Sequence, residues 1–247
     1  MINYLGKYYP ENSFWHNADP RSKLTLTIVI ILSLTVLKPS GLFIPVVIVA
    51  GLYLTARVPL RMGWLVIVRF KWLLLITLLV NFWGNGPGNG GILIIGNLIK
   101  LGITILIAAW LNYVTKPLSL IDGLAKWLQP LTVFRLPVAD LALAAGLVFS
   151  FIPVLWDQAE QVLVAQKLRG AAPGKAWWQN QAWLRSTLIP IFIRAIRKAA
   201  AVAFAMEARG YRSGRNRTPW IELKFGAGDW LVVAIAIIYL ICVTVLI

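Results

Sequence analysis

The basic stretch of residues 157–217 contains two similar endings, Ala165-Gln166-Lys167-Leu168-Arg169-Gly170 and Ala205-Met206-Glu207-Ala208-Arg209-Gly210. Before each ending, a proline (Pro153 or Pro190) opens a proline-free run of about four to five helical turns. Glycine tolerates the left-handed conformation that often follows the end of a helix, and an arginine in the last turn opposes the negative end of the helix dipole. The sequence therefore predicts two helix ends, here called tips, each with an arginine that points away from the apolar body.

The composition indicates an integral membrane protein. Of the 247 residues, 59% are hydrophobic and 13% are charged, whereas soluble domains carry about 25% charged residues. Several apolar runs approach the roughly 20 residues that a helix needs to cross a bilayer. Residues 1–23 are polar and aromatic, without an apolar core before a small-residue cleavage site. We therefore expect no cleaved signal peptide, and the first apolar run should remain as a membrane helix.

The charge and the rare residues exclude several classes of function. The net charge is +15, but the Lys and Arg residues lie between apolar runs, which is the positive-inside pattern of a membrane protein rather than a nucleic-acid footprint. Cys242 is the single cysteine and His16 the single histidine. An internal disulfide, a thiolate metal cluster, a zinc site or a histidine-based triad within this chain is thereby excluded.

About five transmembrane helices are predicted, at residues 24–37 and 42–56, in a third run ending near residue 82, and at residues 92–113 and 230–247. The stretch 57–71 is predicted as a basic loop and the glycine-rich stretch 84–91 as a plain hairpin. Residues 1–23 and 57–71 hold seven Lys or Arg, whereas 38–41 and 83–91 hold one. This asymmetry predicts a cytoplasmic N-terminus and an external C-terminus. Lys100, inside the fourth run, is expected to extend to the outer interface.

Three regions follow from this pattern: an N-terminal transmembrane region (1–115), cytoplasmic-side helices (116–224) and a C-terminal transmembrane helix (225–247). In the middle region, a short amphipathic helix is predicted at residues 118–131. A long helix should then run over 135–169 with a kink at Pro153, and a second over 177–209 with a kink at Pro190. Each would be roughly 45–50 Å long. They are too apolar for free cytosolic helices, so we expect them to lie obliquely and half in the membrane.

The second long helix combines a basic face with small residues. Arg194, Arg197 and Lys198 share one face at spacings of three and four residues. Small residues allow helices to approach closely in lipid, and this helix carries a run of them: Ala199, Ala200, Ala201, Ala203, Ala205 and Ala208. We therefore expect this alanine run to cross the first long helix at Val162, Val164 and Ala165, which places Arg169 and Arg209 on separate arms of an X.

No catalytic or metal site emerges from the residue inventory. Asp157 and Glu160 share a helix face, and Asp140 lies further back on the same predicted helix. Without a histidine or a second carboxylate group, this pair indicates a hydrated edge rather than an acid–base site. We expect no enzymatic activity and no metal ligands in this chain.

These segments resemble the T component of energy-coupling factor transporters, the transmembrane coupling subunit typified by EcfT and CbiQ. The resemblance extends from Asp19-Pro20-Arg21-Ser22-Lys23-Leu24 to Met206-Glu207-Ala208-Arg209-Gly210-Tyr211-Arg212, through Pro117-Leu118-Ser119-Leu120 and residues 136–153. The Arg169 and Arg209 motifs at this separation are its most specific part. Leu168 stands where small residues are common in the family.

The resemblance implies an L-shaped, all-helical subunit of a prokaryotic cytoplasmic membrane. Its two tips would dock into grooves of two ATP-binding-cassette ATPases, which bind the ATP and magnesium, so that this chain itself needs no cofactor. A small membrane subunit, the S component, would bind a vitamin or a transition-metal ion for uptake. The coupling residues implied are Leu168, Arg169, Gly170, Ala208, Arg209 and Gly210, supported by Gln166, Lys167, Glu207, Tyr211 and Arg212.

Three alternatives stay open from the sequence alone. A conventional ABC importer permease would dock one ATPase through one cytoplasmic loop, which does not explain two similar tips. A membrane enzyme of lipid metabolism would need a clustered acidic or histidine site. A structural scaffold would not need paired, exposed Arg-Gly ends.

Overall fold

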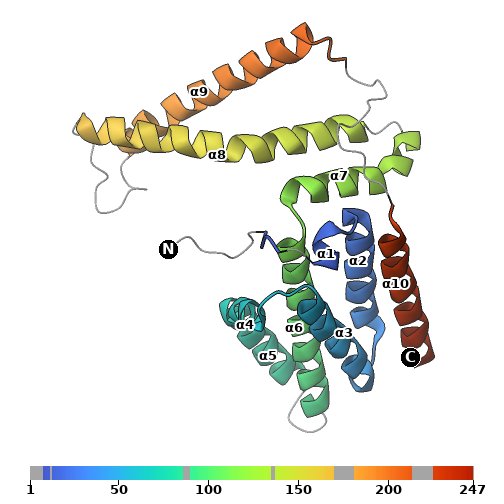
Figure 1. Cartoon of the computed structure of the whole chain (residues 1–247). Helices are drawn as coiled ribbons and strands as arrows, with labels where there is room; N and C mark the ends of the chain where they lie inside the picture. The colour runs from blue at the N-terminus through green and yellow to red at the C-terminus, as the bar shows by residue number, and fades with distance from the viewer. Residues whose placement is uncertain are drawn as a thin grey trace. The chain divides into compact units, whose positions relative to one another are not determined.

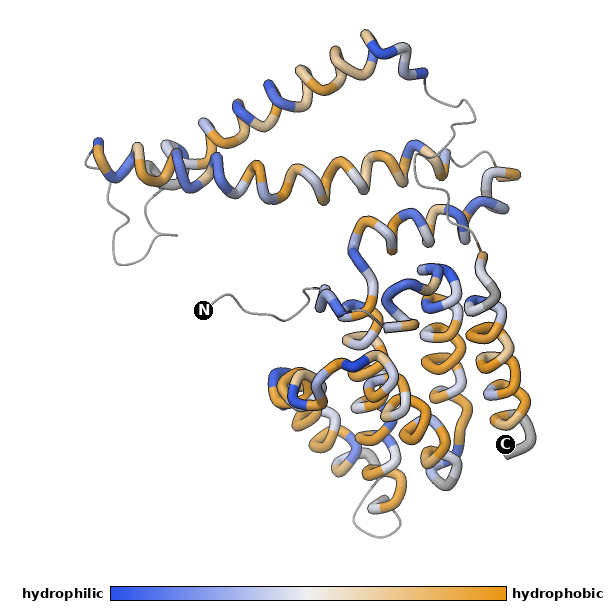
Figure 2. The backbone as a smooth tube through the Cα atoms, viewed as in Figure 1, coloured by the Kyte–Doolittle hydropathy of each residue, from blue (hydrophilic) through white to orange (hydrophobic). Residues whose placement is uncertain are grey.

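Helices are the only regular structure in the residues that the structure describes, which are 8–11, 13–85, 90–134, 137–169, 181–212 and 225–246. In this computed structural model the chain forms two units, one of Met1–Gln129 with Trp220–Ile247 and one of Pro130–Pro219. Figure 1 labels the helices of each unit, and Figure 2 shows how apolar residues dominate them. The predicted all-α class is confirmed.

The first unit is built from eight α-helices and one short 3-10 helix, whereas η2 (Gln129–Phe134) lies at the boundary with the second unit, which begins at Pro130. These are α1 (Phe14–Asn17), α2 (Pro20–Val36), η1 (Pro39–Leu42), α3 (Phe43–Thr55), α4 (Leu60–Arg69), α5 (Lys71–Asn85), α6 (Gly90–Val114), α7 (Pro117–Trp127) and α10 (Ala227–Leu246).

Helix α2 lies at the centre of the first unit, between α6 and α10 (Figure 1). Leu26, Ile30 and Leu34 recur every four residues along α2 and are buried, as expected for one face of a helix. On α6, the indole of the fully buried Trp110 donates a hydrogen bond of 3.2 Å to the carbonyl of Leu52 in α3. Apolar periodicity therefore sets the core, and one buried indole links two of its helices.

The helices of this unit alternate in direction. At one end of α2, Asp19 and Ser22 contact Asp229 of α10, and at the other end the hydroxyls of Ser33 and Tyr239 share a hydrogen bond. Helices α2 and α10 therefore run in the same direction. Helix α6 runs the opposite way, because Trp110, near its end, packs edge-to-face against Trp15, which precedes α2.

Two described helices, Gly91–Val114 and Val138–Leu168, are long and apolar enough to cross a membrane. The first agrees with the run predicted at 92–113. Leu60–Arg69 and Lys71–Trp83 pass the same test together but are bent by 58°. Phe43–Thr55 and Gly228–Val243 are shorter apolar helices. The structure thus supports a membrane protein, and five as the number of spans stays a prediction.

One sequence prediction in this unit is wrong. The stretch 57–71 is predicted as a loop, but most of it forms α4, because its cations alternate with apolar residues at helical spacing. Gly63 and Val66 are the buried positions of α4. A Cβ on Gly63 would lie 3.3 Å from the side chain of Leu106 in α6, so glycine permits this close approach.

A buried polar cluster holds the start of α2 against the start of α10. Asp229 is 5% exposed and accepts hydrogen bonds from the Asp19 N–H (2.7 Å), the Ser22 hydroxyl (2.9 Å) and the Gly226 N–H (2.9 Å). The Lys23 side chain, at the beginning of α2, is also buried. Burial lowers the pKa of the Lys23 ammonium to about 8, although the nearby Asp229 and Asp19 carboxylates raise it. The carboxylates thus supply the negative charge that a buried ammonium needs.

The second unit is an antiparallel pair of long helices, α8 (Val138–Leu168) and α9 (Gln181–Ala208). Near the end of α8, the Gln166 amide donates to the Ser186 carbonyl at 3.1 Å. After the end of α9, the Tyr211 hydroxyl donates to Asp140 at 3.2 Å. Pro153 and Pro190 lie inside continuous helices, and the predicted kinks stay predictions. The predicted residues 177–180 of the second arm lie outside the described residues.

The two helices cross at a different place from the one predicted. Val162 and Thr187 are buried, close to the Gln166–Ser186 contact, and Figure 1 shows α9 crossing α8 toward this end. Val164 and Ala165, by contrast, are exposed, and so is every alanine of the run 199–208. Within that run, only Val202 and Met206 are half-buried. Small residues permit a close crossing, but the helices cross where Val162 and Thr187 are buried.

Candidate functional site

The end of α9 has the geometry of a Schellman motif around Arg209. The Gly210 N–H donates to the Glu207 carbonyl at 2.9 Å, and the Tyr211 N–H donates to the Met206 carbonyl at 3.0 Å. Gly210 has a φ of +76°, the left-handed conformation that this motif requires. The predicted role of Gly210 as the helix-ending glycine is confirmed. Arg209, the last residue before it, is exposed.

Tyr211 fastens this tip to the other helix of the pair. Its hydroxyl reaches Asp140 in the first turn of α8, 71 residues away in sequence. Next to this contact, the two helices leave an open cleft of about 650 Å³ between Leu143 and Leu147 of α8 and Val202 and Met206 of α9. Arg209 and Arg212 also line the cleft. No local sequence signal pairs Tyr211 with Asp140, because only the antiparallel fold brings them together.

The end of α8 presents the first predicted tip. The Arg169 N–H donates to the carbonyls of Ala165 and Gln166, both at 3.2 Å, which closes the last turn. Leu168 is 84% exposed, and Lys167 and Arg169 are exposed too. Gly170, predicted to end this helix as Gly210 ends the other, lies outside the described residues. An exposed leucine beside an exposed arginine gives this tip both an apolar and a cationic contact.

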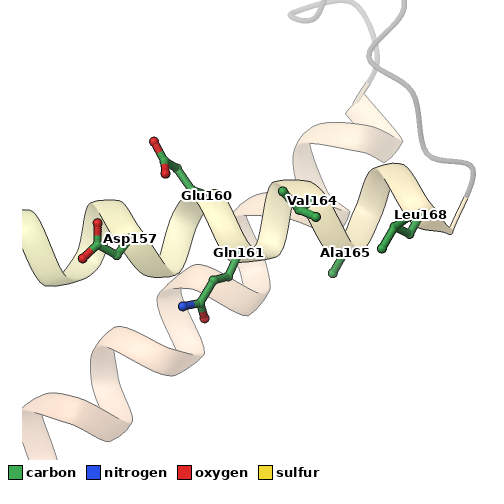
Figure 3. A pocket seen from close by; sticks show the side chains of 6 residues that line it. All are labelled: Asp157, Glu160, Gln161, Val164, Ala165 and Leu168. Atoms are coloured by element: carbon green, nitrogen blue, oxygen red, sulfur yellow. The ribbon is translucent and has the colours of Figure 1, made fainter. Parts of the chain in front are cut away.

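A shallow groove runs along α8 toward this tip (Figure 3), on a face where Asp157, Glu160, Gln161, Val164, Ala165 and Leu168 line a volume of about 490 Å³. The Trp156 indole donates to Glu160 at 2.9 Å. Among the described residues, no group of three or more His, Cys, Asp or Glu is placed to hold a metal ion. The groove is a mixed polar and apolar surface, as expected from the spacing of Asp157 and Glu160.

The cations of both tips have no acidic partner within the described part of the chain. Lys167, Arg169, Arg209 and Arg212 form no ion pair there, and Glu207 pairs with none of them. An arginine presents five N–H donors in a planar fork that suits carboxylates and carbonyl groups. The tips are therefore available to acceptors on another molecule.

The fold places the two tips at opposite ends of the helix pair. Because α8 and α9 are antiparallel, the end of each lies beside the beginning of the other. At 1.5 Å per residue, Arg169 and Arg209 are separated by about 40 Å along the pair. Such a spacing suits the binding of partner molecules at two separate points, and it does not bring the side chains of the two tips together in one site.

Alanine in place of Gly210 should loosen the second tip. Open space surrounds the position where a Cβ would lie, so the cost comes from the left-handed backbone alone, about 1–2 kcal/mol. Hydrogen exchange at the Gly210 and Tyr211 amides should accelerate roughly 5- to 30-fold. Gly146→Ala is the matched control, because Gly146 has equal space but lies inside α8, where alanine is favoured. Unchanged exchange in Gly210→Ala would contradict the motif.

Comparison with known proteins identifies similar chains over nearly the full length. The model of the CbiQ family, described as cobalt transport protein, matches residues 11–220. The energy-coupling factor transporter transmembrane protein EcfT of Listeria innocua is 34% identical over 95% of this chain and 94% of that protein. The EcfT proteins of Bacillus selenitireducens and Bacillus subtilis are 31% and 30% identical, over 95% of this chain and 93% and 94% of their own lengths.

Proposed function

Because the chain belongs to the CbiQ family and is the transmembrane component of an energy-coupling factor transporter, we propose that its two arginine tips dock onto two ATP-binding-cassette ATPases. One observation supports this most: two exposed arginines, unpaired among the described residues, lie at opposite ends of a single helix pair. Each guanidinium would meet carboxylate or carbonyl groups in a groove of one ATPase.

The helix pair would transmit the motion of the ATPases. The hydrogen bonds at the end of α9 and the Tyr211–Asp140 contact hold the second tip to both helices. The Gln166–Ser186 contact joins the helices near the first tip. ATP binding and hydrolysis would change the separation of the ATPase grooves, and a pair fastened near both ends would follow that change as a unit.

A small membrane subunit would bind the transported substrate. Exposed apolar side chains on α8 and α9, such as Val148, Phe149 and Phe204, offer a surface to a hydrophobic partner. That S component would bind a vitamin or a transition-metal ion and release it inside the cell. In this proposal the chain has no catalytic role and no cofactor of its own, since ATP and magnesium belong to the ATPases.

The chain would lie in the cytoplasmic membrane of a prokaryote, with its N-terminus inside and its C-terminus outside. The parallel direction of α2 and α10 and the opposite direction of α6 support this arrangement, because they match alternating crossings. The basic residues of 1–23 and around α4 also favour the cytoplasmic side.

The test is a detergent pull-down of the tagged chain from its native membrane, with every co-purifying protein identified. We expect two ATPase subunits together with one small hydrophobic protein, whose identity would give the substrate class. ATPases with a second large permease would indicate a conventional ABC importer instead. Recovery of the chain alone, under conditions that preserve other ABC assemblies, would overturn the proposal.

A further inference from the structure

Helix α9 has three distinct faces. One carries exposed apolar side chains, with Phe192 65% and Ile196 66% exposed. At 100° per residue, Arg194, Arg197 and Lys198 are centred roughly 170° away from them around the helix axis. A third side, marked by the half-buried Ile191 and Ala195 and by Val202 beside Leu147, faces α8.

The side chains of the basic face have no binding partner in the described part of the chain. Arg194, Arg197 and Lys198 are exposed, and none forms an ion pair or hydrogen bond with a described residue. They lie at least 11 residues before Arg209, or about 16 Å along the helix, so they are not part of the second tip. Their acceptor is therefore not among the described residues.

The opposite placement of the two faces identifies the kind of surface. A helix with a cationic face opposite a large apolar face lies in the membrane interface, with its apolar side toward the acyl chains. Arginine and lysine then extend along the apolar boundary until their charged ends reach the headgroups. An acidic protein surface would attract the cations equally well, but it would not by itself account for the apolar face on the opposite side of the same helix.

We propose that Arg194, Arg197 and Lys198 form a binding site for the phosphate groups of anionic phospholipids, which holds α9 along the cytoplasmic membrane surface. This inference goes beyond the docking of the tips, because it concerns another face of α9. It requires only that the chain resides in a membrane.

The experiment follows thermal unfolding of the purified full chain in detergent by tryptophan fluorescence, while dioleoylphosphatidylglycerol or dioleoylphosphatidylcholine is added. We expect stabilisation by the anionic lipid and not by the zwitterionic one. Each charge near an anionic surface contributes about fivefold in affinity. The variant R194Q/R197Q/K198Q should therefore need on the order of 100-fold more phosphatidylglycerol for half-maximal stabilisation.

Matched variants separate charge from folding. R197Q should cost about fivefold, whereas R185Q, which removes an exposed cation of the same helix from the side of the apolar face, should have no such effect. R194K/R197K should behave as the wild type does, and 0.5 M NaCl should weaken the response of the unaltered chain.

Two results would overturn the proposal. One is an equal response of the wild type and R194Q/R197Q/K198Q to phosphatidylglycerol. The other is a loss of ATPase capture in R194Q/R197Q/K198Q with an unchanged lipid response, which would assign the face to an acidic protein surface. Because the lipid measurement uses the chain without ATPases, its failure is distinct from failure of the docking proposal.

Discussion

Alanine in place of both Arg169 and Arg209 should abolish ATP-driven uptake while the chain still folds and inserts. Truncating one arginine of a charge-paired interface costs about 2–5 kcal/mol, part of it from the partner group left unpaired. Each single change should therefore weaken ATPase binding by roughly 30- to 4000-fold. Because the arginines lie about 40 Å apart along the helix pair, their effects should add. The measurement is the amount of ATPase recovered with the tagged chain, together with substrate uptake in the native host.

Two controls make this result specific to the tips. Arg61→Ala removes an exposed cation from α4 of the first unit and should leave ATPase recovery unchanged. Lysine at positions 169 and 209 retains the charge but loses the planar fork, so it should give partial recovery. Wild-type uptake in the double alanine variant would refute the role of the tips.

Alanine in place of Asp229 should strongly destabilise the first unit. The carboxylate accepts three hydrogen bonds, from the N–H groups of Asp19 and Gly226 and from the hydroxyl of Ser22. Its loss leaves these donors without their acceptor and removes a negative charge beside the buried Lys23. We expect a loss of about 3–5 kcal/mol in the free energy of unfolding, and a fall in Tm of roughly 10 °C.

The control for this change is Asp122→Ala, because Asp122 is an exposed acid on α7 in the same unit. It should shift the Tm by less than about 2 °C. Hydrogen exchange provides a second readout: in Asp229→Ala the amides at the start of α10 and α2 should lose protection. An unchanged Tm in Asp229→Ala would show that the cluster does not hold the two helices together.

The membrane class and the helical fold follow from composition, since few charges and long apolar runs suit only a membrane environment. The role of Gly210 is predictable from its local pattern, because a glycine after an arginine-ended helix matches the backbone geometry of a helix end. Such features depend on residues within one or two turns of each other, which the sequence displays directly.

The errors arise where distant contacts decide the outcome. Four cations around Pro59 favour a loop at 57–71, yet packing of Gly63 and Val66 stabilises α4. The alanine run on α9 suggests the crossing point, yet Val162 and Thr187 are the buried residues of the pair. Packing against a neighbouring helix outweighs local composition in both cases.

By itself, the sequence determined that this protein is a helical membrane protein with an arginine at the ends of two long helices, because hydropathy, charge placement and helix-ending signals are local properties. Only the tertiary structure decided that Asp229 joins the starts of α2 and α10, that Tyr211 contacts Asp140, and that the antiparallel pair separates Arg169 from Arg209. These contacts join residues as many as 210 positions apart, and they form because buried polar groups must find partners wherever the packing of apolar faces brings the helices together.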